Sequence, residues 1–205
     1  MRLRRWCDRC GGKTVAVVLA CWMLAWPAPS SAIEVAPAPE QVRAALERGQ
    51  AAAKVRTPPN ELYAWFGGTG EWEPRGFLMT KLSGLAVMAA HFALRSERPA
   101  ETDIRQILDE KTMLVSAMIY GNHPAFARDS YLVLTQGART IKPITVRFDG
   151  QAQRTSMWPG APAYQAKVVA SFAYDGFDPR ARTRISVFPS AGGEVAFDVD
   201  FVRVE

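Results

Sequence analysis

A two-residue hydrophobic period runs through the C-terminal half of the chain and limits the folds open to it. The clearest run is YQAKVVASFAYD, residues 164–175, in which every second side chain is apolar. Such alternation is typical of a β-strand with one buried face. Similar runs lie at 112–121, 131–137, 139–150, 183–188 and 194–204, the last two joined by the hairpin-like connection PSAGG. The chain is therefore predicted to be mostly β, an antiparallel, immunoglobulin-like β-sandwich.

One of these runs contains a proline. Residues 139–150 place Ile144, Val146 and Phe148 on one face, but Pro143 lies among them. Because proline cannot donate a ladder hydrogen bond, this strand should be an edge strand or carry a bulge. A Rossmann-like sheet is disfavoured, because helices do not separate the strands.

Helical spacing is confined to the N-terminal half. Residues 76–95 predict a short strand followed by a helix near 84–95; one long element, including a membrane span, is the alternative, interrupted by Lys81, Ser83 and His91. A second helix is expected near 101–110, so the two form a short insertion after the first strand. Residues 40–54 carry a thin apolar stripe, which predicts a peripheral, loosely docked helix.

The first 32 residues have the pattern of a cleaved signal peptide. Five basic residues and one acidic residue precede the apolar run Val15–Trp26, and small residues at Ser30 and Ala32 follow. Cleavage is expected after Ala32, which makes Ile33 the mature N-terminus and places the protein in the periplasm or outside the cell. Lipidation at Cys21, which would anchor it to the membrane, is the minor alternative.

All three cysteines, Cys7, Cys10 and Cys21, belong to this segment. The Cys7–Cys10 pair has C-x-x-C spacing, but removal with the leader would leave it without a fold in which to bind zinc or exchange disulfides. The mature chain would retain 20 basic and 19 acidic residues of the 25 and 20 in the full sequence, a net charge of +1. A nucleic-acid-binding domain typically carries a high net positive charge, so we expect no nucleic-acid partner.

The mature chain divides into an N-terminal helix with a Pro/Gly-rich aromatic loop (33–75) and a sandwich domain (76–205). Exposed aromatic side chains serve glycan or protein contacts, although they can also cover a core. Trp65 is expected to be mainly structural and Trp72 the likelier contact, because charged residues surround Trp72. The candidate binding residues are Tyr63, Trp65, Phe66, Trp72 and Trp158.

Catalytic and metal motifs are missing from the sequence. Asp198 and Asp200 point the same way on one strand, which a solvated acidic face also produces. His91 and His123 lie in different contexts without metal-ligand spacing, and no G-x-S-x-G elbow occurs. We expect no catalytic residues, no metal and no cofactor.

The leading hypothesis is an exported, non-catalytic envelope module that binds or scaffolds another protein. A hydrolase with a loop site near His123 and a glycan-binding sandwich using Trp65, Trp72 and Trp158 are the alternatives. The sequence leaves the partner and the oligomeric state open.

Overall fold

The structure, a computed structural model, describes residues 33–204 of the chain. The predicted signal peptide and the lipidation alternative at Cys21 lie outside the described residues. Within that range the chain forms ten strands, three α-helices and three short 3₁₀ helices, and all strand pairs are antiparallel. The protein is therefore mostly β, as the alternation predicts.

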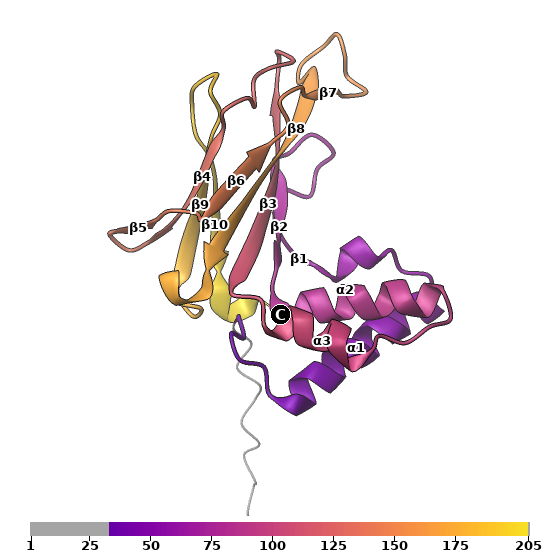
Figure 1. Cartoon of the computed structure of the whole chain (residues 1–205). Coiled ribbons are helices and arrows are strands. Elements are labelled where there is room, and N and C mark those ends of the chain that lie inside the picture. Colours follow the sequence, from indigo (N-terminus) through magenta and orange to yellow (C-terminus); the bar gives the residue numbers. More distant parts are fainter. Residues whose placement is uncertain (1–32, 205) are drawn as a thin grey trace, which may run out of the picture.

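Two sheets pack face to face (Figure 1). The first, sheet A, has the order β1 (Ala64–Gly67), β2 (Arg75–Met79), β3 (Thr112–Gly121), β8 (Tyr164–Ala173) and β6 (Thr145–Phe148), with β7 (Gln153–Arg154) also paired to β8. The second, sheet B, has the order β10 (Val195–Asp200), β9 (Arg182–Phe188), β4 (Tyr131–Gln136) and β5 (Arg139–Ile141).

The core lies between these sheets and follows the predicted alternation. In β3 the buried positions are Met113, Val115, Ala117 and Ile119, and in β8 they are Ala166, Val168, Ala170 and Phe172. Side chains from β4, β9 and the C-terminal 3₁₀ helix (Phe201–Arg203) complete it, with Phe201 fully buried.

The predicted strand over 139–150 is two strands in different sheets. β5 is an edge of sheet B and β6 is an edge of sheet A, and Pro143 lies in the crossing between them. The expectation of an edge strand is thus correct, but the expected common face is not. Val146 packs against the core, whereas Ile144 is 61% exposed, because the chain changes sheet there.

The helices gather beside one end of sheet A and form a layer of their own (Figure 1). They are α1 (Pro39–Lys54), α2 (Lys81–Leu94) and α3 (Glu101–Leu108). Residues 76–95 are strand plus helix, and α2 begins three residues earlier than expected because Thr80 caps it, its Oγ1 accepting from the Ser83 N–H at 3.2 Å. Among the described helices, none is both long and apolar enough to cross a membrane.

Helix α1 is peripheral to the sandwich, yet it is not loosely docked. It packs along α2 through Ala45, Gly49 and Ala52, which are buried. A Cβ at Gly49 would lie 2.1 Å from the Ala86 carbonyl oxygen, so only glycine allows this approach. The stripe that looks thin in sequence is a close small-residue contact.

Residues 57–75 are more ordered than the predicted loop. They include a 3₁₀ helix (Pro59–Leu62) and strand β1, which pairs with β2 and places the chain's first strand before the one predicted. The helical insertion therefore follows the second strand of the structure.

Candidate functional site

The outer face of sheet A, which points away from the core, is apolar over β1, β2 and β3. In β3 the outward positions alternate with the buried ones and include Leu114, Met118 and Tyr120, all half-buried. An antiparallel sheet facing water usually presents polar residues on that side. Over β8 and β6 the outer face is mainly polar, with Gln165, Lys167, Ser171 and Arg147 around Val169.

Aromatic side chains cluster on this apolar part. Trp65 of β1 lies opposite Phe77 of β2, with ring centroids 5.3 Å apart in an edge arrangement. Tyr63 stacks on the same Phe77 at 4.3 Å. The Trp65 Nε1–H donates to the Asn60 carbonyl at 2.9 Å, and the Arg75 guanidinium lies 5.8 Å from the Trp65 ring. These contacts fix the ring while leaving it 46% exposed.

Trp72 extends the cluster along the sheet. Its ring meets Tyr120 edge-on at 6.2 Å, and the Tyr120 hydroxyl donates to the Glu71 carbonyl at 3.2 Å. The turn before β2 is braced by Glu73, whose carboxylate accepts from the Gly70 N–H at 2.9 Å. We call the surface formed by Tyr63, Trp65, Trp72, Phe77, Met118 and Tyr120 the aromatic face.

Three of the five predicted binding residues thus come together: Tyr63, Trp65 and Trp72. Phe66 lies on the inner face of sheet A and packs on Phe197 with ring centroids 5.0 Å apart, so it is part of the core packing between the sheets. Trp158 belongs to the β7–β8 loop, at the end of the sandwich away from the helices, where Arg154 lies 4.1 Å from its ring (Figure 1). Trp65 is more exposed than Trp72, which is half-buried, so the charged neighbours of Trp72 did not predict the relative exposure of the two rings.

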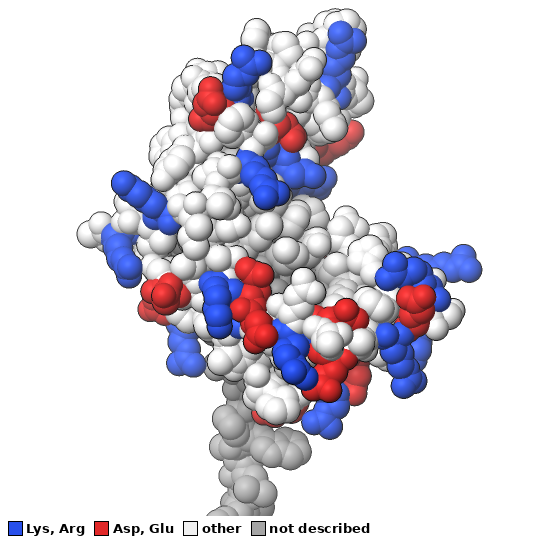
Figure 2. All heavy atoms as spheres, viewed as in Figure 1, with Lys and Arg blue, Asp and Glu red and all other residues white. Residues whose placement is uncertain are grey.

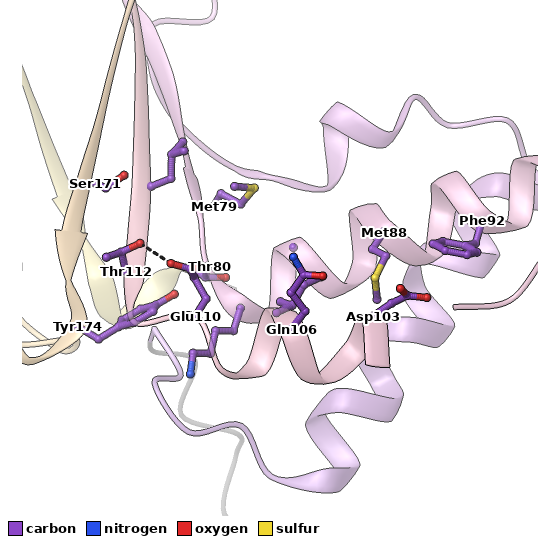
Figure 3. Close-up of a pocket in the computed structure, with 14 residues that line it drawn as sticks. Met79, Thr80, Met88, Phe92, Asp103, Gln106, Glu110, Thr112, Ser171 and Tyr174 are labelled. Atoms are coloured by element: carbon purple, nitrogen blue, oxygen red, sulfur yellow. Dashed lines mark hydrogen bonds between the residues drawn. The ribbon is translucent and has the colours of Figure 1, made fainter. Parts of the chain in front are cut away.

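A groove of about 540 Å³ adjoins the aromatic face, where α2 and α3 meet sheet A. Met79, which follows Phe77 on the same face of β2, and its cross-strand partner Leu114 form its sheet end. Gly84, Met88, Phe92 and Ile107 continue it along the two helices (Figure 3). Figure 2 shows the notch between the sandwich and the helical layer, with charged side chains concentrated on the outer end of the helices.

Polar groups surround the sheet end of the groove. Tyr174 is 6% exposed, and its hydroxyl has no hydrogen-bond partner among the described residues. Burial raises the pKa of Tyr174 to about 12. The Lys81 backbone N–H acts in the opposite direction, although it and the Tyr174 hydroxyl do not form a hydrogen bond of good geometry. The Thr112 hydroxyl donates to Glu110 at 2.8 Å, the dashed bond in Figure 3.

Lys81 lies beneath the same end. Its Nζ donates to the Leu108 carbonyl and lies 5.4 Å from the Tyr174 ring. Burial lowers the pKa of Lys81, with Lys111 adding to the effect while Asp109 and Glu110 oppose it. The Lys81 ammonium group is therefore engaged within the protein, where its hydrogen bond to the Leu108 carbonyl joins α2 to α3.

The other residues that suggested chemistry have local partners. The Asp198 carboxylate lies 3.7 Å from Arg184, and Asp200 caps the C-terminal 3₁₀ helix by accepting from the Val202 N–H. The His123 Nδ1 accepts from the Ala125 N–H at 3.1 Å within a turn. Across residues 33–204, no three His, Cys, Asp or Glu side chains gather as a metal site would require.

Sequence reasoning missed the residues that complete the aromatic face, namely Phe77, Met118 and Tyr120. A signal was present in TMLVSAMIYG, where both sets of alternate positions contain large apolar residues. Such a strand is covered on both faces, or it meets something outside the domain.

Comparisons with known proteins give little more. No protein-family description matches the sequence, and no curated protein matches it. Among solved structures, the archaellum periplasmic stator protein FlaG from Sulfolobus acidocaldarius matches 43% of this chain and 86% of its own, with 8% identity and a TM-score of 0.30. The FlaF and FlaG stator complex from the same organism gives the same identity and TM-score, over 43% of this chain and 77% of that one.

Proposed function

We propose that this protein is an exported, non-catalytic module of the cell envelope that binds another protein through its aromatic face. The observation that carries the proposal is the half-exposed apolar surface over β1, β2 and β3. Tyr, Trp, Phe and Met are enriched where proteins meet, and Lys and Glu are depleted there. The aromatic face has this composition, whereas the neighbouring strands of the same sheet are polar.

Rigidity supports a binding role for this surface. Phe77 contacts the rings of both Tyr63 and Trp65, and the hydrogen bond from the Trp65 Nε1–H to the Asn60 carbonyl fixes the orientation of the indole. Aromatic side chains held in one orientation lose little conformational entropy on binding, so more of the buried area contributes to affinity. The pattern of residues 1–32 supports export, which would place this surface in the periplasm or outside the cell.

A matched pair of tryptophans tests the proposal. Trp65 and Trp158 are 46% and 45% exposed, and each has an arginine beside its ring, but they lie on different parts of the molecule. Immobilised wild-type protein should retain a partner from envelope extract, and Trp65→Ala should lower that retention about tenfold or more. Trp158→Ala should retain the partner as wild type does.

Equal loss for both variants, or no loss for either, would contradict the proposal. Loss with both and retention of envelope polysaccharide instead of protein would favour the glycan-binding alternative. Circular dichroism and melting curves of each variant distinguish lost binding from lost folding.

A further inference from the structure

Helix α3 has an apolar face that the protein does not fully cover. Ile104, Ile107 and Leu108 follow helical spacing, yet none of the eight residues of α3 is buried; of these three, Ile107 is the one that lines the groove. Across the groove, Met88 and Phe92 of α2 are likewise half-buried. A short amphipathic helix gains most of its stability by burying such a face, so this one lacks part of its cover.

Acidic side chains border this apolar groove. Asp103 lies at its outer end and Glu110 at its sheet end (Figure 3). Among the described residues that line it, Lys81 is the one cation, and it is buried and bonded to the Leu108 carbonyl. Arg95, which lies over the Phe92 ring at the outer end, is paired with Glu97 at 3.5 Å. The groove therefore presents negative charge and apolar surface together. An anionic lipid head or a fatty acid would meet these carboxylates unfavourably.

We propose that this groove receives a short amphipathic α-helix of the partner protein, with large apolar residues on one face and Lys or Arg near its ends. The inference rests on the proposed function and adds the chemistry of the partner. Met88 and Met79 suit such an occupant, because unbranched thioether side chains adapt to different apolar surfaces. Amphipathic helices enter apolar grooves through residues spaced three or four apart.

The dimensions fit a helix of about three turns. Helix α2 borders the groove from Lys81 to Phe92, which is about 16 Å at 1.5 Å per residue. An occupant of about eleven residues would therefore contact both helices along its length and sheet A at one end.

Both ends of the groove are acidic. Asp103 lies at the outer end, where one of its oxygens accepts from the Ala100 N–H, and Glu110 lies at the sheet end. The Tyr174 hydroxyl is buried behind the lining and makes no contact with an occupant. A basic side chain of the occupant would meet a carboxylate at either end, so the occupant is expected to carry Lys or Arg near both ends of its apolar face.

A random 16-residue peptide library displayed on phage, panned against the purified protein, tests this assignment. Enriched peptides should carry apolar residues three and four apart, flanked by Lys or Arg. A synthetic peptide of the enriched sequence should bind Gln106→Lys/Glu110→Lys at least tenfold more weakly. Glu47→Lys, which changes a charge on the exposed side of α1, should leave its Kd unchanged.

Three results would overturn the inference: enriched peptides that are acidic or lack helical spacing, a Kd unaltered by the groove variants, or displacement of the peptide by dodecanoic acid. A peptide weakened by Trp65→Ala and not by the groove variants would also overturn it, while leaving the aromatic face as the docking surface. Failure of the Trp65 and Trp158 comparison instead removes the proposed function itself.

Discussion

Trp65 and Phe66 are neighbours in the chain and lie on opposite faces of sheet A. The sequence places both in a loop, where nothing distinguishes their roles. Pairing with β2 turns this segment into strand β1, and strand alternation then sends Phe66 toward Phe197 and Trp65 toward solvent. The sequence indicated both residues as candidate binding residues. The face on which each side chain lies depended on pairing with β2, in which Trp65 lies opposite Phe77 and Phe66 opposite Gly76.

These neighbours should respond differently to truncation. Phe66→Ala should destabilise the fold by about 2–3 kcal/mol, because it removes a ring packed on the core. Trp65→Ala should cost about 1 kcal/mol, from a single exposed hydrogen bond and the contact with Phe77. Thermal unfolding of both variants measures the difference, and an equal loss would show that Trp65 is structural after all.

Tyr174 carries a buried hydroxyl that the fold does not satisfy. Because its pKa in the folded protein, about 12, is above its usual value of 10.0, its contribution to stability is complete below pH 10 and is lost between pH 10 and pH 12. Tyr174→Phe should remove this loss, on the order of 2 kcal/mol.

At neutral pH the same variant should match wild type or gain up to about 1 kcal/mol, because no hydrogen bond is broken. Denaturant unfolding at pH 7 and pH 11 provides the comparison, and at pH 11, midway between the two pKa values, about half of the loss, ~1.4 kcal/mol, is expected in wild type. Destabilisation at pH 7 would show that the hydroxyl has a partner after all.

Two glycines, one in each of the packed helices, test the helical layer. At Gly49 a Cβ would lie 2.1 Å from the Ala86 carbonyl oxygen, so Gly49→Ala should force α1 away from α2 and cost about 2 kcal/mol or more. At Gly84 the nearest atom, on Ile107, is 3.6 Å away, and Gly84→Ala should stabilise α2 by about 1 kcal/mol.

Melting temperatures of the two variants should therefore move in opposite directions. A rise for both would mean that α1 is as loosely docked as its sequence suggests. The loose docking predicted for α1 followed from its few large apolar residues. A stripe of small residues can pack closely, but only against a helix with a matching surface. That partner, α2, is visible only in the fold.

For the whole molecule, the local periods were enough to predict the mostly β class, the helical insertion and the peripheral helix. Long-range information was missing. Residues 139–150 look like one strand, and only the assignment of β5 and β6 to different sheets explains why Pro143 is tolerated and Ile144 is exposed. The groove was equally hidden, because it is built from β2, β3, α2 and α3, which meet only after folding.

The first described residue links the predicted cleavage site to the fold. Ile33 is 2% exposed within the core, and its N–H donates to the Pro179 carbonyl at 3.3 Å. Cleavage beyond Ile33 would remove a core side chain, so we expect processing after Ala32, with Ile33 as the first residue. Ile33→Ala should lower stability by about 2–3 kcal/mol. N-terminal sequencing of the mature protein checks the cleavage point. A mature chain that begins at Val35 or later and keeps wild-type stability would refute the link between cleavage and the burial of Ile33. A mature chain that begins at a lipidated Cys21 would make the protein membrane-anchored.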